Sequence, residues 1–142
     1  MATKILLVDD DAGFASVMQE RLSLAGFAVT ALTTGHDLFQ QLRMEDPHIV
    51  VLDLMLPDVG GVQCLKMVKE AYPEIQVIIL TGMRDSEIEK LAKQYGAFAY
   101  LKKPCSGQVL LEAANAAAVI ANKARAQRKE RNSEENQDSN SF

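Results

Sequence analysis

Short runs of apolar residues alternate along the chain with longer stretches in which apolar residues recur every three or four positions. The short runs are rich in Val, Ile and Leu and too short for helices, which is typical of buried strands in a parallel sheet. The longer stretches have the spacing of amphipathic helices. The predicted strands cover residues 3–8, 27–32, 49–52, 75–80 and 97–101.

A helix is predicted after each of these strands. Gly26 and Gly96 end the first and fourth helices as C-terminal caps. Residues 86–89 read Ser-Glu-Ile-Glu, the pattern of a capping box that would start the fourth helix. The strict alternation of strand and helix predicts an α/β fold, a doubly wound five-stranded parallel sheet with right-handed crossovers.

Polar side chains follow four of the predicted strands. Asp9 and Asp10 come after the first strand, Asp53 after the third, Thr81 after the fourth and Lys103 after the fifth. Taken alone, an aspartate after an apolar run is more often a turn former. The carboxyl ends of parallel strands meet at one edge of the sheet, where such folds build ligand sites, so we expect these groups to lie together.

This set of groups is chemically coherent. Crowded carboxylates repel one another and protonate more easily unless a cation compensates them. A site with oxygen ligands from the protein and several waters suits Mg²⁺. A hydroxyl and an ammonium beside that cation can donate hydrogen bonds to phosphoryl oxygens. The pattern therefore predicts an anionic phosphoryl group bound through a metal.

Composition narrows the function classes. The 142 residues are 48% hydrophobic and 24% charged, as in an ordinary soluble domain, and the formal charge of −4 gives no reason to expect nucleic-acid binding. Cys64 and Cys105 lack metal-ligand spacing and indicate a reducing compartment, with Cys64 expected in the core. No signal peptide or membrane-spanning run is evident, so we expect a cytoplasmic protein.

Four motifs in order carry a family resemblance: LLVDDD, VVLDLMLPDVGG, ILTG and AYLKKP. On alternating strand–helix units, they resemble the receiver domain of bacterial two-component response regulators, across about residues 3–122. The resemblance implies the flavodoxin-like receiver fold of chemotaxis regulators. It also implies phosphoryl transfer from a histidine kinase or a histidine phosphotransfer protein, in a regulatory phosphoprotein with slow self-dephosphorylation and not in an enzyme.

The same resemblance implies roles for individual residues. Asp53 would be the phosphoacceptor, and Asp10 would ligate Mg²⁺ directly while Asp9 holds it through water. The Met55 carbonyl would supply a backbone ligand. Thr81 and Lys103 would bind phosphoryl oxygens. In the switch, Thr81 would turn toward the phosphoryl group and Tyr100 would change rotamer.

The motifs depart from the family pattern at three loop positions. Gly60-Gly61 stands where Asp-Gly is usual, Cys105 follows the Lys-Pro pair where Phe is common, and Gly82 follows Thr81 where Ala is common. None of these is an acceptor or a metal ligand. The resemblance also predicts a cis peptide bond between Lys103 and Pro104. Asp11 is expected to cap the first helix in preference to serving as a third metal ligand.

Three other functions stay open at this point. An aspartyl phosphatase of the haloacid-dehalogenase kind would want a second Asp at position 55, where Met stands. A flavodoxin-type flavin binder would want a Ser/Thr/Gly-rich loop after the first strand, where three aspartates stand. A degenerate receiver that binds partners without phosphorylation would normally lack the acceptor, a metal Asp or the Lys.

The end of the chain differs in composition. The receiver domain is expected over residues 1–122, and residues 123–142 form an extension. An alanine-rich helix is predicted from Ser106 to about Arg131, and a disordered tail from Asn132. The half beyond the body has only alanines and charges, too little to hold it down. Either it is solvated, or its small alanines admit a second helix in a homodimer through the fourth helix, fifth strand and fifth helix.

Overall fold

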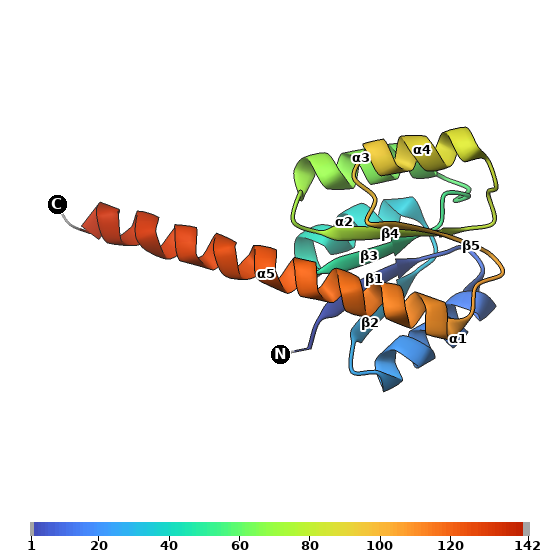
Figure 1. Cartoon of the computed structure of the whole chain (residues 1–142), viewed down its shortest axis with the longest axis horizontal. Coiled ribbons are helices and arrows are strands. Elements are labelled where there is room, and N and C mark those ends of the chain that lie inside the picture. The colour runs from blue at the N-terminus through green and yellow to red at the C-terminus, as the bar shows by residue number, and fades with distance from the viewer. Residues whose placement is uncertain (1, 141–142) are drawn as a thin grey trace.

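The computed structural model describes residues 2–140, and the backbone alternates strand and helix throughout (Figure 1). Most strands are short runs of β-branched or aliphatic residues, and a loop joins each strand to the helix that follows it. The elements are β1 Lys4–Val8, α1 Ala12–Leu24, β2 Ala28–Leu32, α2 Gly35–Glu45, β3 Ile49–Leu52, α3 Gly61–Ala71, β4 Gln76–Thr81, α4 Ser86–Gln94, β5 Ala99–Lys102 and α5 Gly107–Asn140.

The strands form one parallel sheet in the order β2-β1-β3-β4-β5. The chain moves from β1 to β2 on one side, then crosses back to β3 on the other. The order therefore reverses between β1 and β3, where doubly wound sheets open a crevice at the carboxyl ends of their strands. The prediction of a doubly wound five-stranded parallel sheet is confirmed.

Helices cover both faces of the sheet (Figure 1), and a hydrophobic core lies beneath them on each face. Successive strand residues point to opposite faces, so Val50 and Leu52 pack toward α2, α3 and α4, while Ile49 and Val51 pack toward α1 and α5. Cys64 lies in the first core, as predicted, and burial raises the pKa of its thiol to about 11. Burial on both faces explains why β1, β3 and β4 read as nearly continuous apolar runs.

Side-chain caps fix where α1 and α4 begin. Asp11 caps α1, as predicted, because its carboxylate accepts a hydrogen bond from the Phe14 N–H at 3.1 Å. The capping box predicted at Ser86 is wrong. The cap of α4 is Asp85, whose carboxylate accepts from the N–H groups of Glu87 and Ile88. A carboxylate both accepts these bonds and interacts favourably with the helix dipole, so the helix begins one residue after Asp85.

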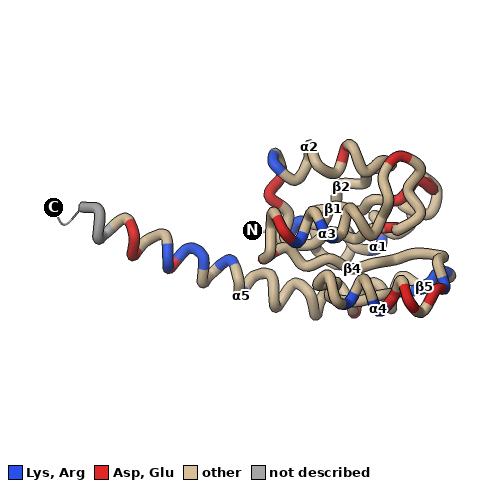
Figure 2. The backbone as a smooth tube through the Cα atoms, turned by 90° about the horizontal axis from the view of Figure 1, so that it is seen from above, with Lys and Arg blue, Asp and Glu red and all other residues tan. Residues whose placement is uncertain are grey.

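Helix α5 leaves the body of the fold and continues alone (Figure 2). Its first half buries Leu110, Ala114 and Ala117 against the sheet. The predicted disorder from Asn132 is wrong over the described residues, because the helix runs to Asn140. The polar tail contains no Gly or Pro, and extending an existing helix adds one hydrogen bond for each residue fixed. Residues 141 and 142 lie outside the described part.

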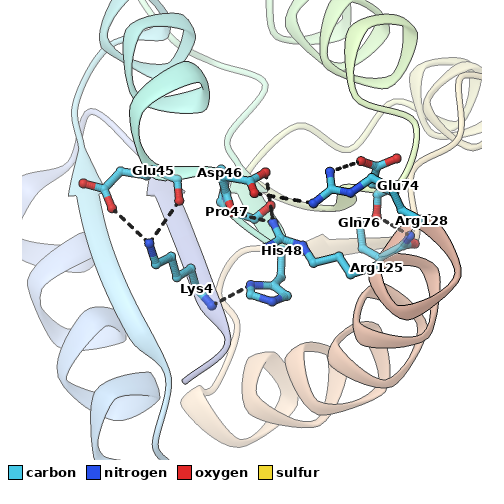
Figure 3. A network of polar contacts seen from close by, with 9 residues as sticks. All are labelled: Lys4, Glu45, Asp46, Pro47, His48, Glu74, Gln76, Arg125 and Arg128. Carbon is cyan, nitrogen blue, oxygen red and sulfur yellow. Dashed lines mark hydrogen bonds and ion pairs between the residues drawn. The ribbon is translucent and has the colours of Figure 1, made fainter. Parts of the chain in front are cut away.

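Two arginines anchor α5 where it leaves the sheet (Figure 3). Arg125 donates to the backbone carbonyls of Asp46 and Pro47, the latter at 2.6 Å, and Arg128 donates to the Glu74 carboxylate at 2.6 Å. These partners lie in the α2–β3 and α3–β4 loops. The prediction that nothing holds this part of the helix is therefore wrong for the turn around these arginines.

Within residues 2–140, no helix has an apolar stretch long enough to cross a membrane. This includes α5, whose 34 residues are interrupted by charges.

Candidate functional site

Three carboxylates gather at the carboxyl edge of the sheet. Backbone pairing brings Val8 beside Leu52, and the Asp53 N–H donates to the Val8 carbonyl at 3.0 Å, so the residues after these strands are neighbours. Asp9, Asp10 and Asp53 each offer an oxygen within 4.8 Å of the others. Asp9 and Asp53 are only 1% and 4% exposed, whereas Asp10 is exposed. The structure brings together the acid cluster that the sequence predicts.

Lys103 supplies the positive charge in this cluster. Its ammonium donates to Oδ2 of Asp9 at 2.7 Å and to Oδ2 of Asp53 at 3.0 Å. Burial raises the pKa of Asp9, and hydrogen bonds from Lys103 and the Asp11 N–H offset this only in part. Burial alone would lower the pKa of Lys103, but its hydrogen bonds to the two carboxylates outweigh this and raise that pKa. The lysine therefore places a positive charge directly beside Asp9 and Asp53.

The other oxygen of Asp53 is held by two donors. The Thr81 hydroxyl donates to Oδ1 at 2.8 Å, and the Met55 N–H donates to the same oxygen at 3.0 Å. Thr81 is fully buried at the end of β4, the strand paired with β3. These bonds fix the plane and direction of the Asp53 carboxylate at the end of its strand.

A hard divalent cation fits the chemistry of this donor set. The ligand atoms of Asp9, Asp10 and Asp53 are all carboxylate oxygens, and the exposure of Asp10 leaves room for water ligands. The ammonium of Lys103 already shows that the cluster attracts a cation between its buried members. The role of the Met55 carbonyl as a ligand stays a prediction.

Tyr100 is connected to Thr81 through one residue. The Tyr100 hydroxyl donates to the Met83 carbonyl at 2.9 Å, and the Met83 N–H donates to the Thr81 hydroxyl at 3.3 Å. Burial is the main cause that raises the pKa of Tyr100, so its hydroxyl stays protonated and can donate this bond. If the Thr81 hydroxyl moved, its hydrogen bond with Met83 would change, and Met83 also binds the Tyr100 hydroxyl.

Sequence reasoning missed three contacts around the site. Phe14 places its ring 4.5 Å from the Lys103 nitrogen, and Arg84 donates to the Lys103 carbonyl at 2.9 Å. The Asp58 carboxylate accepts from the N–H groups of Gly35 and His36, which ties the loop after Asp53 to the start of α2. The Phe14 contact could not be found from the sequence, because the periodicity of apolar residues does not say which groups an aromatic ring meets.

The loop geometry distinguishes the two glycines in the loop after Asp53. A Cβ atom at Gly61 would lie 2.2 Å from the Leu54 Cα, so only glycine fits there. At Gly60 the nearest atom to such a Cβ is 3.8 Å away, an ordinary contact. The predicted cis peptide bond between Lys103 and Pro104 is present.

Comparison with known proteins points to one family. The sequence model described as the response regulator receiver domain matches residues 5–115. The DNA-binding transcriptional regulator NtrC of Proteus hauseri is 35% identical over 100 residues, which is 70% of this chain and 21% of that regulator. The chain therefore spans about a fifth of the length of this relative.

Solved structures give the same result. A CheY-like response regulator receiver domain protein from Methanospirillum hungatei JF-1 has a TM-score of 0.83 and 26% identity, covering 87% of this chain and 99% of that one. The BeF3-activated DrrB receiver domain has a TM-score of 0.76 and 36% identity, covering 82% of this chain and 97% of that one. Both the sequence and the fold are similar to receiver domains.

Proposed function

Because the chain belongs to the response regulator receiver domain family, we propose that it acts as a phosphoacceptor in two-component signalling, with Asp53 as the acceptor. The observation that carries this proposal is the fixed Asp53 carboxylate. Thr81 and Met55 hold one of its oxygens, and Lys103 lies on the other. A carboxylate used only to form a turn would not need a buried hydroxyl from one strand and an ammonium from another.

The acid cluster would hold the metal for this reaction. Asp9, Asp10 and Asp53 would hold Mg²⁺, with the Met55 carbonyl as a further ligand. When bound, Mg²⁺ supplies positive charge that a phosphoryl group needs beside so many carboxylates. The metal charge would also relieve the repulsion between the buried acids.

Asp53, Lys103 and Thr81 have different roles in the proposed phosphoryl transfer. One Asp53 oxygen forms a bond to phosphorus while the bond between phosphorus and the imidazole nitrogen of a phosphohistidine breaks, and the imidazole keeps the electron pair. Negative charge spreads over the equatorial phosphoryl oxygens as this happens. Lys103 can swing from Asp9 and Asp53 to one of these oxygens, and the Thr81 hydroxyl can donate to another.

The acyl phosphate then acts as a switch. It adds strong acceptor oxygens and roughly −2 charge where a carboxylate stood. Thr81 would exchange its bond to Asp53 for a bond to the phosphoryl group, which perturbs Met83 and the Tyr100 hydroxyl bound to it. The proposed result is a population shift in the face formed by α4, β5 and α5.

The proposed phosphoryl donor is a histidine kinase or a histidine phosphotransfer protein. We infer that residues 1–122 are the receiver unit and that residues 123–142 are a helical extension and polar tail. A homodimer through α4, β5 and α5 is part of the proposal. Light scattering with and without beryllofluoride tests it, and a monomer in both states at high micromolar concentration would contradict it.

Phosphate uptake from a small donor tests the proposed function. Phosphoramidate with Mg²⁺ is expected to add one phosphate to the intact protein by mass spectrometry, and a chelator is expected to prevent it. Asp53→Asn is expected to take up none. Asp11→Asn is the matched control, since asparagine caps a helix as well as aspartate does. Uptake by Asp53→Asn at the wild-type rate would overturn the assignment.

A further inference from the structure

We propose that Phe14 is a positioning residue for phosphoryl transfer, which holds the Lys103 ammonium over Asp53 through the face of its ring. The proposal deepens the proposed function and rests on it. It concerns a contact that joins α1 to the loop after β5, 4.5 Å from the lysine nitrogen to the ring centroid. An ammonium this close to an aromatic face is attracted by the negative charge on that face.

The ring contact adds a third interaction to the two hydrogen bonds of the Lys103 ammonium. An ammonium has three N–H donors, and two acceptors of Lys103 are Oδ2 of Asp9 and Oδ2 of Asp53. The Phe14 ring offers a third interaction that is not a directional hydrogen bond. It therefore keeps the lysine near the site without competing strongly for a donor that a phosphoryl oxygen would need.

The position of Phe14 is itself fixed by local structure. Its N–H donates to the Asp11 carboxylate that caps α1, so the residue is set in the first turn of the helix. Its ring is half-buried and packs against the core beneath α1 and α5. A ring held in this way restricts where the long, flexible Lys103 side chain can go, which lowers the entropy lost when the lysine binds a phosphoryl oxygen.

Replacing the ring distinguishes this role from simple packing. Phe14→Leu keeps an apolar side chain but removes the aromatic face, and is expected to slow phosphorylation by phosphoramidate about threefold to thirtyfold. Phe14→Tyr keeps the face and is expected to stay within about twofold of wild type. Phe27→Leu is the matched control, because Phe27 packs against the same core but follows α1 at the opposite edge of the sheet.

A double-mutant cycle shows whether Phe14 acts through Lys103. In a Lys103→Met background, Phe14→Leu is expected to change the remaining phosphorylation rate by less than about twofold. An equal loss in both backgrounds would overturn the proposal and make Phe14 a packing residue. Thermal unfolding of each variant shows whether it is folded.

A second measurement needs neither metal nor phosphate. In protein labelled with ¹³C at lysine Cε, the Lys103 methylene protons are expected to be shifted upfield by the ring and identified by their absence in Lys103→Arg. The shift is expected to disappear in Phe14→Leu and to persist in Phe14→Tyr. An unshifted signal in wild type would overturn the proposal. Wild-type protein that takes up no phosphate would instead overturn the proposed function, whatever the lysine signal shows.

Discussion

The Lys103 ammonium lies 3.0 Å from Oδ2 of Asp53, so a cation lies directly beside the proposed phosphoacceptor. The same ammonium lies 2.7 Å from Asp9. These contacts connect β1, β3 and the loop after β5, which are far apart in sequence. The contribution of these charges to stability can therefore be measured by unfolding the protein with a chelator present.

Lys103→Met is expected to destabilise the metal-free protein by about 1–3 kcal/mol at pH 7, because it leaves two buried carboxylates without their charged donor. The loss is expected to shrink at lower pH, where a protonated carboxyl no longer needs the ammonium. Urea unfolding with a chelator present, at pH 5 and pH 8, measures both. A loss that is equal at the two pH values would contradict this electrostatic account.

Asp9 is expected to give the metal-free protein a characteristic pH dependence. Burial raises the pKa of Asp9 in the folded protein above its usual value of 3.8. The folded state therefore binds this proton more tightly than the unfolded state, so the Asp9 contribution to stability falls as pH rises from 3.8 through the raised pKa.

Asp9→Asn removes this group and is expected to flatten that part of the stability profile and to stabilise the metal-free protein at pH 7. The same variant is expected to bind Mg²⁺ more weakly, since a carboxylate ligand is lost. Denaturation across pH and calorimetric titration with Mg²⁺ measure the two effects. If the variant is less stable than wild type at pH 7, burial of the charged Asp9 carboxylate does not destabilise the metal-free protein.

Gly61→Ala is expected to destabilise the protein by about 3 kcal/mol or more, because the new Cβ would lie 2.2 Å from the Leu54 Cα and neither backbone can move freely. Gly60→Ala is the neighbouring control and is expected to stay within about 1 kcal/mol of wild type, since its Cβ would lie 3.8 Å from the nearest atom. Equal effects of the two substitutions in urea unfolding would contradict the close approach.

Arg125→Ala is expected to destabilise the protein by about 1–3 kcal/mol, because the charged guanidinium satisfies two loop carbonyls and is largely buried. Arg128→Ala is expected to cost about 0.5–1 kcal/mol, since its ion pair with Glu74 is partly exposed. The exposed Arg131 is the control, and Arg131→Ala is expected to stay within about 0.5 kcal/mol. An effect at Arg131 as large as at Arg125 would contradict the anchoring role.

The fold and the cluster were predictable for the same reason. Alternating strands and helices force a parallel sheet, and a parallel sheet brings the residues after its strands to one edge. Asp9, Asp53, Thr81 and Lys103 could therefore be placed together from their positions in the chain alone.

Contacts between helices and loops were not predictable in this way. Arg125 and Arg128 belong to a run of charges, and such a run does not reveal that loop carbonyls and Glu74 lie within reach. The start of α4 was misplaced by one residue because Asp85 and Ser86 are both good caps, and only the backbone shows which one is used. The Phe14 ring faces Lys103 because of how α1 sits on the sheet, which its apolar spacing does not specify.

The most direct test of the account is to locate the phosphoryl group chemically. Hydride from borohydride reduces an aspartyl phosphate to homoserine and releases phosphate, which marks the acceptor permanently. After treatment with phosphoramidate and Mg²⁺, peptide mass spectrometry is expected to find homoserine at position 53 alone, and nowhere in Asp53→Asn. Homoserine at position 9 or 10, or none in a protein that has taken up phosphate, would contradict Asp53 as the phosphoacceptor.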